Sequence, residues 1–372
     1  MHKRVFAAVL LLSLGLISSA FAFGTISTLG QNREHERITR HALSCTFAPT
    51  MANCFEGNTI SELAGRGGTF GGVGAPDNPT RGLLSSSAAH CDNGDFMPGI
   101  PGYANLPGGT QMAVAFSTLV SCRTWMDANL NTAVTDARLL ILPNGTVDDS
   151  QMPTVFNCTF NGTKGRAKCN VLEDFGLTLH ASEDFYSHTN WADIPDPARP
   201  PGISNPPGLG MAVPSPWIDL RVVTPFPAGL MSGCFESIPE RFYCNEGPGG
   251  RVKHAFLNKD TGTIDPAIGM GTTERGRVNG NFARAVRDAI ADAQDKWLDL
   301  QQRIMRTYPT TGALMICAIT HDDPRRDCVP NGQRQNAGLR SLGMLALFLL
   351  ASGGMFLMFG RSGPKDGGLQ AG

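Results

Sequence analysis

The chain has 372 residues, a formal net charge of −1, 17% charged residues and 41% hydrophobic residues. This balance excludes a disordered charged chain, a polytopic membrane protein and a nucleic-acid binder held by bulk positive charge. The 44 glycines and 25 prolines predict a folded chain with long loops between its elements.

The first 22 residues have the pattern of a secretory signal peptide. A basic start is followed by an apolar run over residues 5–17 and by the small residues of an A-x-A site at Ala20–Ala22. An uncleaved N-terminal anchor is the alternative, but the apolar run is short for a membrane span. We therefore expect residues 1–22 to be removed and the mature chain to begin at Phe23.

Helical periodicity marks three segments of the exported chain: Glu34–Leu43, Val171–Asn190 and, most strongly, Asn281–Tyr308. In the last segment apolar residues recur every three or four positions, Asn281 fits an N-cap, and Pro309 ends the pattern. Its other face carries the polar residues Arg284, Asp288, Asp292 and Asp295. We expect this helix to pack on the core, without chemistry of its own.

Strand-like alternation is weak apart from Trp217–Thr224, while glycine-rich and proline-rich tracts fill 65–82 and 194–227. The predicted fold class is therefore mostly α with long, disulfide-stapled loops. The even number of cysteines, ten, after a signal peptide indicates disulfides in an oxidising compartment, although the spacing does not fix their connectivity. Pairing of sequence neighbours would give Cys45–Cys54, Cys91–Cys122, Cys158–Cys169, Cys234–Cys244 and Cys317–Cys328.

Residues 341–360 form an uncharged, mostly apolar run flanked by arginines. Twenty helical residues rise about 30 Å, the thickness of a bilayer core, so this run predicts one C-terminal transmembrane helix. A buried core helix is the alternative. The predicted order is a metal-binding exported domain over 23–330, a juxtamembrane linker over 331–340, the membrane span, and a cytoplasmic tail over 361–372. The exported domain would lie in the extracellular or periplasmic space.

The chemically most informative segment contains His180, Asp184 and His188, which follow one another at intervals of four residues. On a helix these side chains share one face and spread over about 12 Å along its axis. Residues four apart can bind one ion, but this span is too long for one ion to contact all three. The spacing favours more than one metal ion, with Asp184 bridging two of them. Ordinary polar residues of a helix surface are the alternative interpretation.

Other candidate ligands stand in short polar clusters. His35 lies in EHERITRHAL and His90 in SSAAHCDNGDF, and Asp77 precedes His90 by thirteen residues. Histidine and carboxylate ligands without a matching set of thiolates suit zinc or a similar divalent ion. The predicted cofactor is therefore zinc or another divalent metal, with two or more ions.

These motifs resemble the zinc-dependent phospholipase C and P1/S1 nuclease family, and more closely its Het-C and CinY-like relatives. Members of that family begin the mature chain with an aromatic residue and Gly, which Phe23-Gly24 match, and HASEDFYSHTN is similar to the Het-C and CinY form. The resemblance covers residues 23–35, 77–95, 171–193 and 254–262. It implies a helical fold whose metal ligands are Phe23 through its α-amine, His35, Asp77, His90, His180, Asp184 and His188.

Two features depart from the family pattern. The family's enzymes have two more residues between the helix Asp and the following His, and they add a later His-x3-Glu that this chain lacks. His254 is the less certain substitute, together with Asp193 or Asp260. The resemblance therefore implies a metal-binding fold first and an enzyme second.

Metal ions bridged by Asp184 would lower the pKa of bound water and neutralise charge on a phosphodiester in the transition state. The predicted function is a membrane-anchored, exported, metal-dependent phosphodiester hydrolase similar to phospholipase C, with Asp77 or Asp184 taking the proton of water. The alternative is a non-catalytic Het-C/CinY-like cell-surface or envelope protein with a structural metal centre. A slightly acidic ectodomain favours a phospholipid headgroup over nucleic acid as the partner.

Overall fold

The computed structural model of the chain describes residues 23–27, 31–95, 112–153, 157–235, 244, 251–265 and 267–328. The predicted signal peptide over 1–22 and the predicted membrane span over 341–360 lie outside these residues. Among the residues that are described, no helix is both long and apolar enough to cross a membrane.

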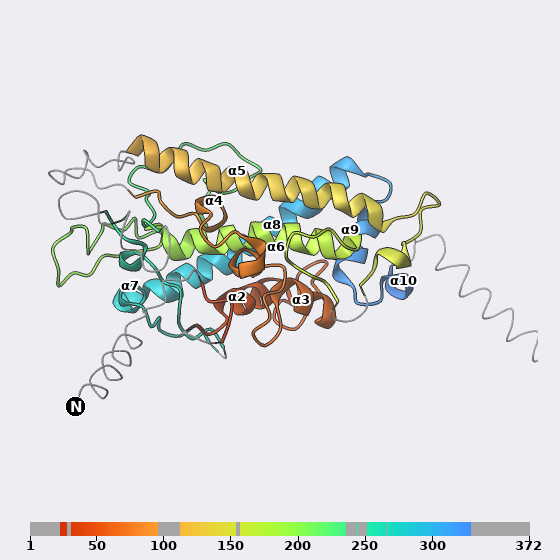
Figure 1. Cartoon of the computed structure of the whole chain (residues 1–372), viewed down its shortest axis with the longest axis horizontal. Helices are drawn as coiled ribbons and strands as arrows, with labels where there is room; N and C mark the ends of the chain where they lie inside the picture. Colours follow the sequence, from red (N-terminus) through yellow and green to blue (C-terminus); the bar gives the residue numbers. More distant parts are fainter. Residues whose placement is uncertain are drawn as a thin grey trace, which may run out of the picture. The chain divides into compact units, whose positions relative to one another are not determined.

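Three long helices organise the fold: α5 (Met112–Ala137), α6 (Ala167–His188) and α8 (Asn281–Thr307). Helix α6 packs against both α5 and α8, and Figure 1 shows α6 between α5 and the shorter α2 and α3. Every residue of α6 is buried. Its polar side chains therefore face other parts of the protein and not solvent.

Shorter elements cover the remaining sides of α6. The short α-helices are α2 (Glu34–Leu43), α3 (Gly57–Ala64), α4 (Ser87–His90), α7 (Glu274–Arg277), α9 (Gly312–Thr320) and α10 (Pro324–Asp327). The 3₁₀ turns are η1 (Ala75–Asp77), η2 (Pro79–Arg81), η4 (Arg138–Leu140), η5 (Asp149–Gln151), η7 (His254–Phe256) and η8 (Val278–Gly280). Within the described ranges β structure is limited to isolated bridges, so the chain is mostly helical, as predicted.

The two halves of α6 serve different purposes. Its first half packs Val171, Phe175 and Leu179 into an apolar core with Trp297 of α8. Its second half carries the polar residues of the candidate site and packs only a few apolar side chains, such as Phe185, into a smaller core. Burying apolar area is the main stabilising contribution, so the first half fixes the helix and the second half can carry polar groups.

A close approach of two backbones places one loop on α6. A Cβ atom added at Gly176 would lie 2.1 Å from the carbonyl carbon of Gly72, and one added at Gly72 would lie 2.4 Å from the carbonyl oxygen of Leu172. Only glycine fits at such a contact. The contact brings Val73 and the η1 turn, which ends at Asp77, beside the middle of α6.

The predicted helices agree with the observed ones to different degrees. Helix α2 has the predicted bounds, and α8 ends one residue before the predicted end. Helix α6 begins four residues earlier and ends two residues earlier than predicted. Helix α5 was not predicted, because its sequence mixes small, apolar and hydroxyl side chains around the helix without a clear apolar stripe.

The predicted strand at Trp217–Thr224 is wrong, because this segment forms turns and bends. The Arg123 guanidinium of α5 donates hydrogen bonds to the carbonyls of Trp217 at 2.9 Å and Val222 at 2.9 Å. One side chain therefore satisfies backbone acceptors at both ends of the segment, which curls around it instead of pairing with a strand.

Part of the polar face of α8 is also buried, which its amphipathic pattern does not show. Asp292 is 2% exposed and accepts hydrogen bonds from Lys296 Nζ at 2.8 Å and from the Ser182 hydroxyl of α6. Asn281 does not cap the helix; its side chain instead bonds to the backbone of Ile194 on both sides. Buried ion pairs thus replace apolar contacts where α8 passes the second half of α6.

All five disulfides join neighbouring cysteines in the sequence, which is the simplest of the possible pairings. They link Cys45–Cys54, Cys91–Cys122, Cys158–Cys169, Cys234–Cys244 and Cys317–Cys328. Five disulfides in one chain indicate an oxidising, extracytoplasmic compartment.

Candidate metal centre

One carboxylate, that of Asp184, lies at the centre of the candidate site with its side chain fully buried. Its Oδ2 atom is 3.0 Å from His180 Nε2 and 3.0 Å from His90 Nδ1. Its Oδ1 atom is 3.2 Å from His35 Nε2 and 3.8 Å from His188 Nε2. Four imidazoles from three separate parts of the chain therefore surround one aspartate of α6.

Three of these imidazoles are held by backbone carbonyls through the nitrogen that faces away from Asp184. His180 Nδ1 donates to the Val73 carbonyl at 2.9 Å, and His90 Nε2 donates to the Leu83 carbonyl at 3.2 Å. His188 Nδ1 donates to the carbonyl of His90 at 2.8 Å. A carbonyl only accepts, so the proton of each neutral ring sits on that nitrogen and the other nitrogen carries a lone pair.

The fourth imidazole, His35, is held by a buried carboxylate. Its Nδ1 lies 2.6 Å from Glu183 Oε2, and the other Glu183 oxygen accepts a hydrogen bond from Thr39 Oγ1 at 2.8 Å. Glu183 is fully buried next to Asp184 on α6. Metal-bound histidines in proteins commonly donate their second N–H to a carboxylate or carbonyl, which fixes the ring and its tautomer.

The convergence of these lone pairs tests whether the residues fit a metal ion. His180 Nε2 and His90 Nδ1 are 3.0 Å apart, and two lone pairs at this distance repel unless a proton or a cation lies between them. The buried atoms His35 Nε2, Asp184 Oδ1 and His188 Nε2 have no hydrogen-bond partner among the described residues. Ligand atoms of a tetrahedral zinc ion are separated by about 3.3 Å. The donor set and its distances fit divalent metal ions.

Asp77 completes this group on the side nearest to solvent. Its Oδ1 is 4.0 Å from His180 Nε2, and its Oδ2 accepts a hydrogen bond from the Thr25 hydroxyl. The Asp77 side chain is 9% exposed and that of His90 is 5% exposed, whereas those of His35, His180 and Asp184 are fully buried. Solvent thus reaches the group from the side of Asp77 and His90.

The predicted mature N-terminus runs beside His35. The buried Phe23 ring contacts the His35 ring edge to face with centroids 5.8 Å apart. The Gly24 carbonyl accepts a hydrogen bond from the His35 amide at 3.2 Å, and the Gly24 amide donates to the Asp260 carbonyl at 3.3 Å. Phe23 therefore belongs to the surroundings of the site, and its role as an α-amine ligand stays a prediction.

A second group of candidate ligands forms around His188, at the end of α6. Asp92 Oδ1 lies 3.2 Å from His188 Nδ1, and Asp260 Oδ1 lies 3.3 Å from His188 Nε2. The His254 ring meets the His188 ring edge to face at 4.4 Å, and His254 Nε2 is 3.6 Å from Asp260 Oδ2. His254, the less certain candidate ligand, thus lies beside the candidate ligand His188, and Asp260 lies close to both.

Asp193, the other candidate companion of His254, lies in a different environment. Its two carboxylate oxygens pair with Lys259 Nζ at 2.8 Å and with Arg275 Nε at 2.8 Å, and all three side chains are buried. A lysine and an arginine therefore already neutralise this carboxylate without a metal ion.

The geometry groups the ligand atoms into sets whose members lie within 4.8 Å of one another. The buried sets are His35, Asp77 and His180; His90, His180 and Asp184; and Asp92, His188 and His254. A further set combines His321 with Cys317 and Cys328, but these cysteines form a disulfide and supply no thiolate. His254 and all the histidines and aspartates of the expected ligand list therefore lie in one of the three buried sets, whereas Asp193 and Asp260 lie in none of them.

Charges inside the site shift the pKa values of its members. Burial alone would lower the pKa of His35, but the Asp184 and Glu183 carboxylates raise it to about 10. Burial would likewise raise the pKa of Asp184, but His180, His188 and His35 hold it well below its usual range. The pKa of His180 is lowered by burial. In the metal-free protein, protons on the imidazoles balance the carboxylates, and a metal ion must displace them.

The fold and the site define a mostly helical, disulfide-linked protein with a buried cluster of histidines and carboxylates suited to metal binding. Comparisons with protein-family models, with curated proteins and with solved structures found no match. The sequence reasoning missed Asp92 and Glu183. Their only local signal is their position beside His90 and Asp184, in HCD and SED.

Proposed function

We propose that this protein is an exported, metal-dependent hydrolase of phosphodiesters. The observation that carries the proposal is the ring of four imidazoles, each held at one nitrogen by the protein and turned with the other toward Asp184. Such a buried arrangement would lower the stability of the fold without an ion, because unpaired polar groups in the interior are destabilising. Zinc suits this nitrogen and oxygen donor set, and the three buried sets have room for two or more ions.

The resemblance to the zinc-dependent phospholipase C and P1/S1 nuclease family, and to its Het-C and CinY-like relatives, supports the reaction class. The matching positions run in the family's order along the chain, from Phe23-Gly24 to the triplet on α6. The proposal requires that such positions come together around one buried carboxylate, which is that of Asp184.

The residues around Asp184 would have different roles in such a reaction. A divalent metal bound here would supply positive charge to stabilise a phosphodiester transition state and to acidify water. Asp77 is the carboxylate on the solvent side, so it is better placed than Asp184 to accept a proton from an attacking water. Thr25 donates to one Asp77 oxygen and leaves the other oxygen turned toward His180.

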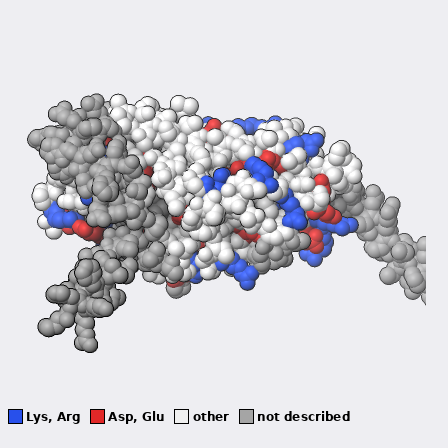
Figure 2. All heavy atoms as spheres, viewed as in Figure 1, with Lys and Arg blue, Asp and Glu red and all other residues white. Residues whose placement is uncertain are grey.

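A phospholipid is the substrate class we favour, with residues 341–360 tethering the domain to a membrane. The face drawn in Figure 2 shows basic and acidic side chains of the described residues intermixed instead of gathered into one basic stripe. Nucleic acid would need such a stripe for its phosphates, whereas a lipid headgroup does not.

A non-catalytic surface or envelope protein with a structural metal centre is the second candidate. The deep burial of most ligands favours it, since the side chains of His35, His180 and Asp184 are fully buried. The missing His-x3-Glu favours it as well.

The test uses the full chain, processed to Phe23 and loaded with zinc. Elemental analysis should find two or more ions per chain, and bis-p-nitrophenyl phosphate and phosphatidylcholine vesicles should be hydrolysed. Asp77→Asn should lower kcat by about 100-fold or more, as expected for a lost general base, and the zinc content of the variant, measured beside it, separates this loss from the loss of a metal ligand. His41→Ala is the control, because His41 pairs with Asp265 at 2.6 Å, outside the site. Bound zinc without turnover would favour the structural centre, and absence of zinc binding would refute both candidates.

A further inference from the structure

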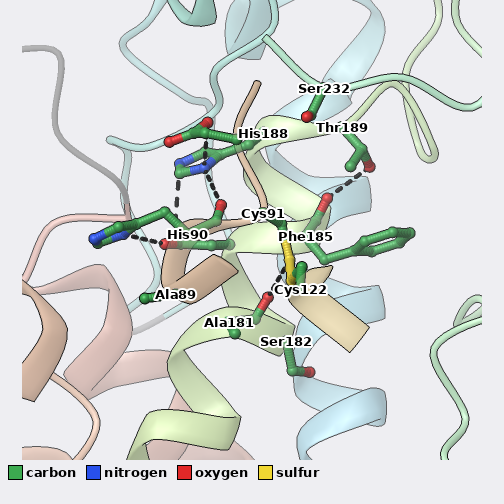
Figure 3. The surroundings of a disulfide bond; sticks show 12 residues. Ala89, His90, Cys91, Cys122, Ala181, Ser182, Phe185, His188, Thr189 and Ser232 are labelled. Atoms are coloured by element: carbon green, nitrogen blue, oxygen red, sulfur yellow. Dashed lines mark hydrogen bonds and ion pairs between the residues drawn. A yellow bond between two sulfur atoms is a disulfide. The ribbon is translucent and has the colours of Figure 1, made fainter. Parts of the chain in front are cut away.

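We infer that the Cys91–Cys122 disulfide is the positioning element that holds ligands of both candidate metal groups. This inference rests on the proposed metal-binding function. Cys91 stands between two candidate ligands in the sequence, His90 and Asp92. The His90 ring turns to Asp184, while Asp92 turns to His188. Figure 3 shows the disulfide beside His90, with the His188 ring bonded to the His90 backbone.

The backbone around Cys91 explains how neighbouring residues reach two different groups. Cys91 has a φ of 54° and Asn93 a φ of 66°, both in the left-handed region that non-glycine residues seldom adopt. These two residues lie just after α4, a helix of only four residues, which is too short to be stable alone. Local sequence preference therefore does not hold the ligands in place, and tertiary contacts must.

The disulfide supplies the covalent contact of this segment with the helices of the site. Cys122 lies on α5, and both sulfur-bearing residues are at most 1% exposed. The Cys91 sulfur also lies 3.2 Å from the carbonyl oxygen of Ala181, one residue after His180 on α6. The turn is thus fixed to α5 and pressed against α6 at the level of the candidate ligands.

A second, noncovalent attachment should keep the segment folded when the disulfide is removed. The Asn93 side chain donates to Ser87 Oγ at 2.7 Å and to the Phe235 carbonyl at 2.6 Å. Its backbone amide donates to the Gly233 carbonyl at 2.7 Å. Loss of the disulfide would therefore let His90 and Asp92 move, but only by small distances. Metal sites tolerate ligand displacements of only about 0.2 Å, so affinity should fall before the fold is lost.

The inference also has a reciprocal consequence. If the disulfide tightens zinc binding by some factor, bound zinc must stabilise the disulfide against reduction by the same factor. A disulfide that only stabilises the fold would be protected no more than the other disulfides of the chain.

The first experiment compares two double variants of the full chain made in an oxidising host. Cys91→Ala/Cys122→Ala should bind zinc about tenfold to 100-fold more weakly than the wild type in competition with a chromogenic chelator, as when groups that orient a ligand are lost. Cys317→Ala/Cys328→Ala removes a disulfide whose cysteines adjoin no proposed ligand in the sequence, and it should keep the wild-type affinity. Circular dichroism reports whether each variant is folded. Alanine is used because a free thiol could itself bind zinc.

The second experiment needs no variant, so it decides the matter if the first double variant does not fold. Wild-type protein is equilibrated with mixtures of reduced and oxidised glutathione with and without zinc, and the reduced fraction of each disulfide is determined by alkylation and mass spectrometry. Zinc should lower the equilibrium constant for reduction of Cys91–Cys122 by about tenfold or more relative to that of Cys317–Cys328. Equal protection of both disulfides, or equal zinc affinity of both folded variants, would overturn the inference and leave the metal-binding proposal intact. A wild type that binds no zinc would overturn both.

Discussion

Two buried carboxylates of this protein are neutralised in opposite ways. Asp193 pairs with the ammonium group of Lys259 and the guanidinium group of Arg275, which are not metal ligands, at 2.8 Å each. Asp184 instead faces four imidazoles, which lose their charge when they lose a proton. The first cluster is complete in itself, whereas the second can exchange its protons for metal ions. Buried charge alone therefore does not mark a functional site; the chemistry of its partners does.

The largest effect should come from removing the carboxylate that the imidazoles share. Asp184→Ala should lower the metal content more than alanine at any other single position, because a bridging carboxylate serves two ions. Elemental analysis of the folded variants measures this, with His41→Ala as the histidine control outside the site. An unchanged metal content in Asp184→Ala would contradict the distinction between the Asp184 cluster and the Asp193 cluster.

A smaller loss is expected when only the N-terminal amine is blocked. A protein with an extra Met before Phe23 should bind one ion fewer than one processed to Phe23, because a peptide nitrogen is a poor ligand and a free amine is a good one. Mass spectrometry confirms the start, and elemental analysis counts the ions. If both forms bind equal metal with equal affinity, Phe23 is not a ligand and His35 needs another partner.

A substitution in the Asp193 cluster should lower the unfolding free energy and leave the metal content unchanged. Asp193→Asn leaves two buried cations without their carboxylate, which typically costs about 3–5 kcal/mol of unfolding free energy. Urea unfolding measures the loss, while the zinc content of the folded protein should stay at the wild-type value. A loss of zinc in folded Asp193→Asn would show that the two clusters are not independent.

A third buried charge sharpens the comparison, because its hydrogen-bond partners among the described residues are neutral acceptors. Lys168 Nζ donates to the His321 carbonyl at 2.5 Å and to Thr59 Oγ1 at 3.1 Å, and burial lowers its pKa to about 8. Since an unfolded lysine titrates near 10.4, the unfolded state binds more protons between these values. Lys168 should therefore contribute a rise of up to about 3 kcal/mol in the unfolding free energy from pH 8 to pH 10.5, which is read as the difference between the wild type and a variant without this charge because His35 and other groups titrate in the same range.

Lys168→Met provides the matched test, because methionine fills similar space without a charge. Its unfolding free energy should lack the rise between pH 8 and pH 10.5 and should exceed that of the wild type near pH 7. Parallel pH profiles for the two proteins would contradict the assignment to Lys168.

The helical elements with a clear apolar stripe could be predicted without the structure. Helix α2 and most of α8 follow from spacings of three and four residues. The sequence also placed His180, Asp184 and His188 on one helix face, because their spacing of four matches the helix period. The correct disulfide partners were the nearest cysteines, although other pairings were equally open.

The neighbours of that helix face, in contrast, depend on how the whole chain folds. Asp92 and Asp260 reach His188 from segments far away in the chain, and no periodicity encodes such contacts. Lys259 likewise pairs with Asp193, although Asp260 follows Lys259 directly in the chain, and Asp260 lies beside His188 and His254. Helix α5 buries one face and exposes the other, but apolar residues such as Phe116 also lie on the exposed face, so its sequence shows no clear apolar stripe. Local patterns fix helices and their faces, while the partners of a buried polar group depend on chain segments that only folding brings together.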